Sequence, residues 1–356
     1  MGCSPHTLSS ASSASARHRP DHFFTARHRA PPRGIAVYQS ARRAKRTSRR
    51  FVTLAAAAAL ACAGVTPASA ADRQDRPVRH NFAEAFFWNV STPRIAPDGA
   101  NDWSCRPSAA HPHPVILLHG TLENMHDNWA AAAPLLANNG YCVFALNFGG
   151  LTPDAWAQGT GDIRDSAHEL AAFVDAVRRS TGAAEVDIVG HSQGAMMPRY
   201  YLKYLGGADK VNRLVGLAPP NHGTTLVGLT ELGKQLNLLG LVNSGLNAVA
   251  PAMTQQEVDS DFLNDLNRNG DTVSGVHYTV IATKYDQIVT PYTSSLLSGR
   301  NVDNIVVQDS CPLDYSEHLE LSYDPIALTL MLNALDPAHP RPVPCLLVLP
   351  LTGPVL

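Results

Sequence analysis

Val186-Asp187-Ile188-Val189-Gly190-His191-Ser192-Gln193-Gly194 is the stretch that decides how this chain folds. Its first four residues form a mostly apolar run typical of a buried strand, and residues 195–204 continue as a helical pattern. Ser192 stands between Gly190 and Gly194 in the pattern G-x-S-x-G, which is typical of a sharp turn from a strand into a helix. Glycine lacks the Cβ that would clash in so tight a turn. We therefore predict that Ser192 projects its hydroxyl from the turn as a nucleophile.

Strand-like and helix-like segments alternate along the chain on both sides of this turn. Alternation of this kind predicts an α/β fold with a mainly parallel central sheet and helices on both faces. Residues 71–356 are long enough for a single domain of this class. The strands are expected at 115–118, 141–146, 186–189, 213–217, 278–283 and 305–308, and helices at 163–179, after Ser192, and from Pro325 to Leu335.

A serine needs a base and an orienting acid to act as a nucleophile at neutral pH. Asp286 follows the strand-like run 278–283, and open α/β sheets place functional side chains at the carboxyl ends of their strands. His318 lies on the loop before the last helix, which begins at Asp324-Pro325 with aspartate as N-cap. We predict that Ser192, Asp286 and His318 are the catalytic residues.

Other residues compete for these roles. His277 lies at the edge of a strand and is expected to be structural, and His222 is expected to be a hydrogen-bonded loop residue near the site. An aspartate in a loop is often only a solvated turn residue. If Asp286 has that role, Asp309 or Asp314 becomes the candidate acid.

The chain resembles the class 2 bacterial lipases, which are secreted triacylglycerol lipases and esterases of actinobacteria with the α/β-hydrolase fold. That fold has its catalytic residues in the chain order serine, acid, histidine, and the three residues above follow this order. Ala195 stands where a further glycine is expected, a change that affects helix packing and leaves the chemistry intact. The resemblance is carried by Pro114–Thr121, Val186–Gly207, Leu217–Thr224, Tyr285–Pro291 and His318–Leu335.

The resemblance implies an oxyanion hole built from two backbone N–H groups. His119-Gly120-Thr121 follows an apolar strand and is similar to the HG-type loop of lipases, in which the N–H after the glycine faces the oxyanion. This assigns one donor to Thr121, whose hydroxyl is a candidate third donor, and the other to Gln193 at the start of the helix. His119 is expected to brace the loop.

The resemblance further implies a serine esterase that cleaves lipid esters through an acyl-enzyme intermediate, most simply a triacylglycerol lipase. The expected partners are a lipid or other ester and, transiently, a lipid interface, and the expected state is a monomer. A short-chain carboxylesterase or a polyester depolymerase would carry the same triad, and a non-catalytic surface protein that kept the fold is a remote alternative. No cofactor or metal is expected, since the sequence has no C-x-x-C or H-E-x-x-H zinc spacing.

Residues 1–70 are predicted to lie outside the fold. Residues 51–65 are an alanine-rich apolar run followed by Ala68-Ser69-Ala70, which together are typical of a signal peptide cleaved near Ala70. This predicts an extracellular protein, exported by general secretion or by a twin-arginine route. Residues 1–46 are either a basic arm or a stretch upstream of the true start, near Val37.

Residues 1–70 hold 11 of the 28 Lys and Arg residues but one of the 30 acids, so the rest is acidic, with 17 basic and 29 acidic residues. Nucleic-acid binding, which relies on basic patches, is therefore not expected. Export also favours disulfides between the four remaining cysteines. Of three possible pairings we predict Cys105–Cys142 and Cys311–Cys345, because each closes one local loop.

The segment Thr225–Leu266 interrupts the alternation and is unusually rich in leucine. One interpretation is a helical pair that packs on the core. The other is a cap over Ser192 that lines an acyl pocket and moves at a lipid surface. The two interpretations are compatible.

Overall fold

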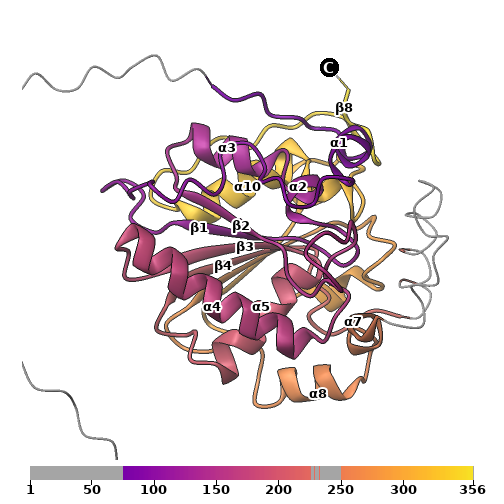
Figure 1. Cartoon of the computed structure of the whole chain (residues 1–356). Coiled ribbons are helices and arrows are strands. Elements are labelled where there is room, and N and C mark those ends of the chain that lie inside the picture. Colours follow the sequence, from indigo (N-terminus) through magenta and orange to yellow (C-terminus); the bar gives the residue numbers. More distant parts are fainter. Residues whose placement is uncertain (1–74, 226–227, 229–231, 233–249, 356) are drawn as a thin grey trace, which may run out of the picture. The chain divides into compact units, whose positions relative to one another are not determined.

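The computed structural model describes residues 75–225, 228, 232 and 250–355. Its central feature is a six-stranded sheet with the strand order β2-β1-β3-β4-β5-β6, in which every neighbouring pair is parallel (Figure 1). The chain turns from β1 to β2 in one direction and then crosses back to β3, so β1 and β3 flank a topological switch point. Open α/β sheets bind ligands outside the carboxyl ends of such strands. The strands are β1 (Val115–Leu118), β2 (Val143–Leu146), β3 (Val186–His191), β4 (Val211–Leu217), β5 (His277–Ala282) and β6 (Val302–Val306).

Helices cover both faces of the sheet because its central strands are apolar on both sides. In β1 the side chains alternate: Val115 and Leu117 belong to one hydrophobic core, Ile116 and Leu118 to the other. The first core includes α3 (Ala132–Asn138) and α10 (Pro325–Leu335), and the second includes α4 (Ile163–Thr181), α5 (Gln193–Tyr204) and α8 (Asp261–Asn267). Figure 1 shows α3 and α10 on one side of the sheet and α4 and α5 on the other. The observed architecture is therefore the predicted α/β class.

Shorter elements complete the described chain. α10 begins at its predicted cap, where the Asp324 carboxylate accepts hydrogen bonds from the N–H groups of Ile326 (2.9 Å) and Ala327 (2.8 Å). This cap fixes the end of the loop that carries His318. The remaining elements are α1 (Phe82–Asn89), α2 (Met125–Asn128), α7 (Pro251–Gln255), α9 (Val307–Ser310), the 3₁₀ helices η2 (Tyr292–Ser295) and η3 (Glu320–Ser322), and a small hairpin of β7 (Val348–Leu349) and β8 (Gly353–Pro354).

The strand predicted at 305–308 was placed wrongly. β6 spans Val302–Val306 and pairs with β5 from Val302 onward, whereas Val307 begins the short helix α9. Asp303 and Asn304 are exposed, because β6 is the edge strand of the sheet. An edge strand need not be apolar, so the apolar pattern missed its start. Val307 is fully buried in the core, which explains why its apolar side chain resembled a strand residue.

Two disulfides are present, and they have the predicted pairing. Cys105 is bonded to Cys142 just before β2, and Cys311 is bonded to Cys345 in the C-terminal segment. None of the described helices is long and apolar enough to cross a membrane. The predicted signal peptide (residues 1–70) lies outside the described residues. Of the predicted cap Thr225–Leu266, residues 225, 228, 232 and 250–266 are described.

Candidate active site

Ser192 occupies a strained turn between β3 and α5. Its backbone angles, φ 53° and ψ −124°, lie in a region that residues other than glycine rarely adopt, and such strain is concentrated at functional sites. The flanking glycines are required by packing. A Cβ on Gly190 would overlap the carbonyl of Gly194, and a Cβ on Gly194 would overlap the carbonyl of Leu118 at the end of β1. The predicted turn geometry is thus present, with the helix starting at Gln193 rather than at residue 195.

Asp286 and His318 form a buried hydrogen-bonded pair. The Nδ1–H of His318 donates to Asp286 Oδ2 over 2.9 Å, and both side chains are 1% exposed. The other carboxylate oxygen, Oδ1, accepts from the N–H groups of Ile288 (2.9 Å) and Val289 (2.7 Å). These bonds fix the carboxylate, and since a carboxylate only accepts, they leave the Nε2 lone pair of His318 available as a base.

The electrostatic surroundings of His318 favour its charged form. Burial opposes the imidazolium, but the charge and hydrogen bond of Asp286 outweigh it, and Glu123 and Glu317 add to the effect. The net result is that the pKa of His318 is raised above its ordinary value. His318 is therefore suited to hold a proton taken from a nucleophile.

The structure brings His318 close to the turn that carries Ser192. Its ring centroid is 5.0 Å from that of His191, the residue directly before the serine. Among the described contacts, no hydrogen bond joins Ser192 Oγ to His318. The three predicted catalytic residues thus lie on three loops that follow β3, β5 and β6, with the base bonded to the acid and adjacent to the turn.

Thr121 and Gln193, the predicted oxyanion donors, lie on two segments that pack against each other. The loop after β1 packs on the serine, since a Cβ on Gly120 would lie 3.3 Å from Ser192 Cβ. Within the described part of the chain, the backbone N–H groups of Thr121 and Gln193 donate no hydrogen bond. Two unpaired backbone donors beside a nucleophile are suited to bind an oxyanion.

A side-chain network holds these two donors together. Gln193 Nε2 donates to Thr121 Oγ1 and to the carbonyl of Gly159, both over 2.8 Å. Gln256, which follows α7, donates from Nε2 to the same Thr121 hydroxyl over 3.0 Å. The Thr121 hydroxyl in turn donates to Gln256 Oε1 over 3.3 Å, so its hydrogen already has an acceptor, and this arrangement does not support the expected role as a third oxyanion donor.

His119 braces the loop rather than carrying protons. Its Nδ1–H donates to the Gly120 carbonyl (2.8 Å), its Nε2 accepts from the Phe148 N–H (3.3 Å), and its ring stacks on that of Phe148. Burial lowers the pKa of His119 to about 4, so the ring stays neutral at physiological pH. This is the bracing role expected from the sequence.

The alternative acids and histidines lie elsewhere. Lys284 forms an ion pair with Asp309 (2.7 Å) at the surface, and Asp314 Oδ1 accepts from the Ser316 N–H. His277 is exposed at the start of β5, and His222 lies 3.4 Å from Asp271. None of them hydrogen-bonds the His318 ring within the described residues, so the geometry favours Asp286 as the acid.

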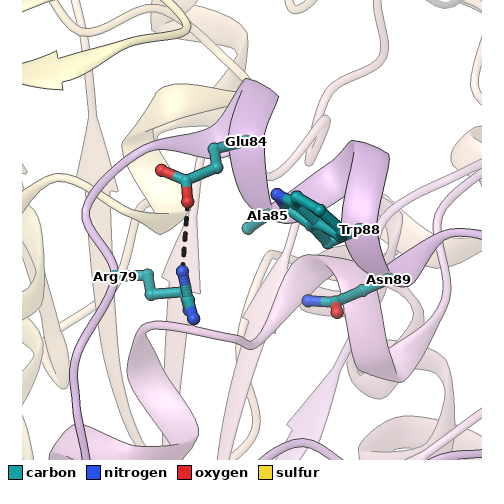
Figure 2. A pocket seen from close by; sticks show the side chains of 5 residues that line it. All are labelled: Arg79, Glu84, Ala85, Trp88 and Asn89. Atoms are coloured by element: carbon teal, nitrogen blue, oxygen red, sulfur yellow. Dashed lines mark hydrogen bonds and ion pairs between the residues drawn. The ribbon is translucent and has the colours of Figure 1, made fainter.

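One hollow of the surface is separate from this site. It has a volume of about 390 Å³, and Figure 2 shows its lining around α1, with an ion pair between Arg79 and Glu84 (3.1 Å) and the indole of Trp88 beside it. None of its lining residues belongs to the site around Ser192. No group of three or more His, Cys, Asp or Glu side chains in the described ranges is arranged to hold a metal ion.

Sequence reasoning missed two buried contacts of the site. One is between Glu123 and His191, and the other joins Gln256 to Thr121. The only signal for Glu123 was an isolated acid directly after the apolar strand and loop that contain His119. For Gln256 there was no signal, since it lies in the segment interpreted as a cap.

The chain matches the family model for lipase (class 2) over residues 112–329, which is more than half of its length. It belongs to the class 2 lipases. The match includes Thr121, Ser192, Asp286 and His318, and it covers the sheet from β1 to β6. The family expected from the sequence motifs is thereby confirmed.

Curated relatives and a solved structure agree with this assignment. A triacylglycerol lipase of Pseudarthrobacter phenanthrenivorans is 35% identical over 97 residues, which cover 26% of this chain and 28% of that protein. A triacylglycerol lipase of Burkholderia plantarii is 35% identical over 130 residues, covering 33% and 35%. The chain thus matches about a third of the length of these relatives. The crystal structure of Aspergillus fumigatus lipase B superposes with a TM-score of 0.50 and 20% identity over 72% of this chain and 65% of that one, which shows the α/β-hydrolase fold.

Proposed function

We propose that this class 2 lipase is a secreted serine hydrolase that cleaves carboxylic esters of lipids, with triacylglycerols as the substrate class, through an acyl-enzyme intermediate. The observation that carries the proposal is the buried hydrogen bond between Asp286 and His318, next to the strained turn of Ser192. The triacylglycerol lipases among its relatives support the choice of substrate.

The proposed reaction is acyl transfer in two steps. Ser192 Oγ attacks the ester carbonyl while His318 Nε2 accepts the hydroxyl proton, and Asp286 stabilises the imidazolium through Nδ1. His318 then returns the proton to the leaving alcohol, which departs and leaves the acyl group on Ser192. Water, deprotonated by the same nitrogen, releases the acid.

The developing negative charge is proposed to bind at the two unpaired N–H groups of Thr121 and Gln193. These donors are fixed before the reaction, because the side chains of Gln193 and Gln256 clamp the Thr121 hydroxyl. Donors that need no reorganisation stabilise a transition state more than the ground state. The reaction draws on the chain's own side-chain and backbone groups.

The remaining features of the proposal rest on the sequence together with the disulfides. Two disulfides and an apolar leader before Ala70 support export to an oxidising compartment. We assign residues 71–356 to one monomeric hydrolase domain that contacts a lipid interface transiently and binds no nucleic acid. The segment 225–266 is assigned as its cap, and the contact of Gln256 with Thr121 supports a link from the end of that segment to the oxyanion hole.

Hydrolysis of p-nitrophenyl esters from acetate to palmitate tests this proposal, with Ser192→Ala as the control variant. A lipase will hydrolyse the long-chain esters, and the variant will lose activity on all of them. Activity limited to short chains would assign the protein to the carboxylesterases instead. If neither short nor long esters react, polyester hydrolysis is the next activity to assay, and its absence would mean a fold that no longer catalyses.

A further inference from the structure

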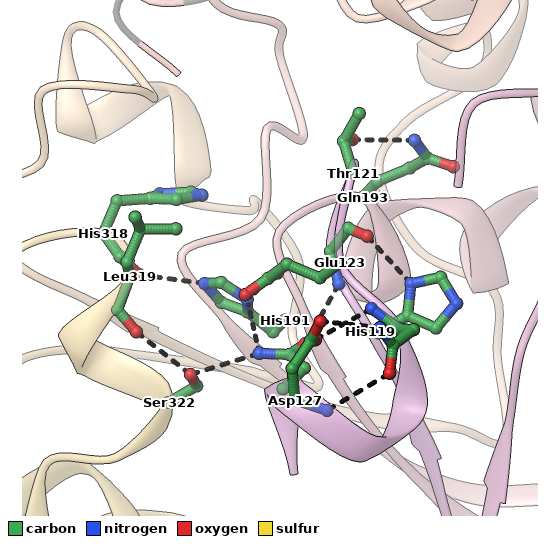
Figure 3. Close-up of polar contacts among 12 residues, drawn as sticks. His119, Thr121, Glu123, Asp127, His191, Gln193, His318, Leu319 and Ser322 are labelled. Atoms are coloured by element: carbon green, nitrogen blue, oxygen red, sulfur yellow. Dashed lines mark hydrogen bonds and ion pairs between the residues drawn. The ribbon is translucent and has the colours of Figure 1, made fainter. Parts of the chain in front are cut away.

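A second histidine and a second acid lie next to the proposed catalytic histidine. Figure 3 shows His191 between Glu123 and the backbone of His318. The Nε2 of His191 is 2.9 Å from the carbonyl oxygen of His318, and its Nδ1 is 3.0 Å from Glu123 Oε2. Both side chains are almost fully buried. His191 therefore bridges the loop of the oxyanion hole and the loop of the base.

The hydrogen-bond partners of His191 occupy both of its ring nitrogens. A carbonyl oxygen only accepts, so Nε2 carries a hydrogen and donates it to the main chain of His318. The other nitrogen, Nδ1, lies 3.0 Å from Glu123 Oε2 and 3.1 Å from the side-chain nitrogen of Asn128. Among the described contacts, neither ring nitrogen of His191 is left for a substrate.

Asn128 connects the Glu123–His191 pair with the loop that carries Thr121. Its Oδ1 accepts from the N–H of Gly120 over 3.0 Å, which turns its amide nitrogen towards His191 Nδ1 (3.1 Å) and Ser322 Oγ (3.2 Å). Ser322 in turn donates to the carbonyl of Leu319, the residue after the base (Figure 3). The loops that carry the oxyanion donor and His318 are thereby connected through one buried cluster.

Four other ionisable side chains face this pair. Burial and the Glu123 charge raise the pKa of Asp127 on α2 well above its ordinary value. Burial likewise lowers the pKa of His119 after β1 to about 4 and raises the pKa of Tyr323 after η3. The remaining neighbour is His318 itself, whose ring lies 5.0 Å from that of His191.

The geometry points to Glu123 and His191 as a second acid–histidine pair whose task is to position His318. His191 holds the main chain of the base by its carbonyl, and Glu123 holds the ring of His191 through Nδ1. His191 and Glu123 are positioning residues, since both nitrogens of His191 are occupied and no hydrogen bond among the described contacts joins either side chain to Ser192. This inference rests on the proposed function of His318 as the base.

Substitutions at His191 separate positioning from mere packing. His191→Phe keeps a ring of similar size and removes both donors, whereas His191→Gln keeps an N–H that can reach the His318 carbonyl. We expect kcat to fall about 100-fold in His191→Phe with KM within about twofold, because a base displaced by about 1 Å loses roughly that factor. His191→Gln is expected to recover about tenfold of that loss. His222→Phe, at a histidine that pairs with Asp271 outside this cluster, is the matched control and should keep kcat within about twofold.

Glu123→Gln and Glu123→Leu test the acid by rescue with a conservative variant. In Glu123→Gln the introduced side-chain amide can still donate to His191 Nδ1, so kcat should fall by about tenfold or less. Glu123→Leu keeps a similar volume without a polar atom, and its kcat should approach that of His191→Phe while circular dichroism shows a folded protein. Equal kcat values in the two Glu123 variants would overturn the inference.

Proton NMR of the free enzyme gives a test that does not depend on any substrate. The downfield Nδ1 proton of His318 reports its hydrogen bond to Asp286, and we expect it to shift or broaden in His191→Phe and to recover in His191→Gln. If esters are hydrolysed but kcat and this resonance are unchanged in His191→Phe, the inference alone fails. If the resonance moves as expected but the wild type hydrolyses no ester, the proposed function fails and the positioning of His318 stands. Should His191→Phe not fold, His191→Gln and the two Glu123 variants decide.

Discussion

Two acid–histidine pairs lie side by side in this molecule, and they differ in one nitrogen. In the Asp286–His318 pair the acid occupies Nδ1 and the Nε2 lone pair has no hydrogen-bond partner among the described residues. In the Glu123–His191 pair both ring nitrogens are occupied, one by the acid and one by the His318 carbonyl. The two hydrogen bonds are almost equally short, at 2.9 and 3.0 Å, and both pairs are buried.

The difference teaches that an acid–histidine hydrogen bond alone does not identify a base. Proton transfer needs a nitrogen with a free lone pair within reach of the nucleophile. His318 has one and His191 does not, although His191 is adjacent to Ser192 in the sequence. A histidine whose nitrogens are both engaged can hold a neighbouring loop but cannot exchange protons with a substrate.

Removal of the base should have the largest effect. His318→Ala is expected to lower kcat by roughly 10⁵-fold or more, because the serine hydroxyl loses its proton acceptor. Ser192→Ala should cost about as much, and the double variant little more, since residues that act as a unit are not additive. Steady-state kinetics with p-nitrophenyl esters measure all three. A His318→Ala enzyme that retains a tenth of wild-type kcat would erase the distinction between the two pairs.

Substitution of the two acids should show the same order, with the larger loss of kcat in the Asp286–His318 pair. Asp286→Asn is expected to lower kcat by roughly 10³- to 10⁴-fold at neutral pH, because an amide favours the wrong tautomer of His318. Glu123→Gln, in the Glu123–His191 pair, should lower kcat at neutral pH by about tenfold or less, since the introduced amide can still donate to His191. The ratio of the two kcat values is the quantity to measure. Equal losses would show that the pairs are not distinguished by function.

The acidic limb of the pH profile sharpens the comparison further. His318 must be neutral to accept the serine proton, and its pKa is raised because the charge and hydrogen bond of Asp286 outweigh its desolvation. The value of kcat/KM should therefore fall, as pH decreases, at a higher pH than about 6.5, where an ordinary histidine titrates. Asp286→Asn should move this limb to lower pH. A wild-type limb below the ordinary histidine range would contradict the assignment.

A buried acid without a histidine gives the smallest predicted effect. Glu320 Oε2 accepts from the Phe82 N–H, and its Oε1 has no hydrogen-bond partner among the described residues. Burial raises the pKa of Glu320 to about 9, with Glu317 and Asp324 contributing. The folded state then binds a proton that the unfolded state releases above about pH 4.5, so this group lowers stability as pH rises from about 4.5 to about 9.

Glu320→Gln should remove this pH dependence without loss of kcat. Melting temperatures at pH 5, 7 and 9 are expected to decline less in the variant than in the wild type, by a few degrees at pH 9. An identical decline in both proteins would show that the folded state does not keep on Glu320 a proton that the unfolded state releases. The result then distinguishes Glu123, a buried acid paired with a histidine, from Glu320, a buried acid that stays protonated without one.

Much of this site was predictable because its parts are coded locally. A glycine on either side of Ser192, an apolar run before it and a helical pattern after it are all within one short segment. Asp286 and His318 were found from their positions after expected strands. The cap of α10 at Asp324 was likewise a local signal, and the structure has it at that residue.

What the sequence did not predict depends on distant contacts. Glu123 and His191 are 68 residues apart, and Gln256 and Thr121 are 135 apart, so no local pattern brings them together. The start of β6 was missed for another reason. An edge strand can expose polar residues such as Asp303, and its limits are set by pairing with β5 rather than by its own composition.

Covalent labelling by a fluorophosphonate tests the central claim most directly. The probe reacts with a serine only where a base activates it, and peptide mass spectrometry identifies the labelled residue. The account predicts one adduct, on Ser192, which disappears in His318→Ala and persists in His222→Phe. An unlabelled wild-type protein, or an adduct on a residue other than Ser192, would contradict it.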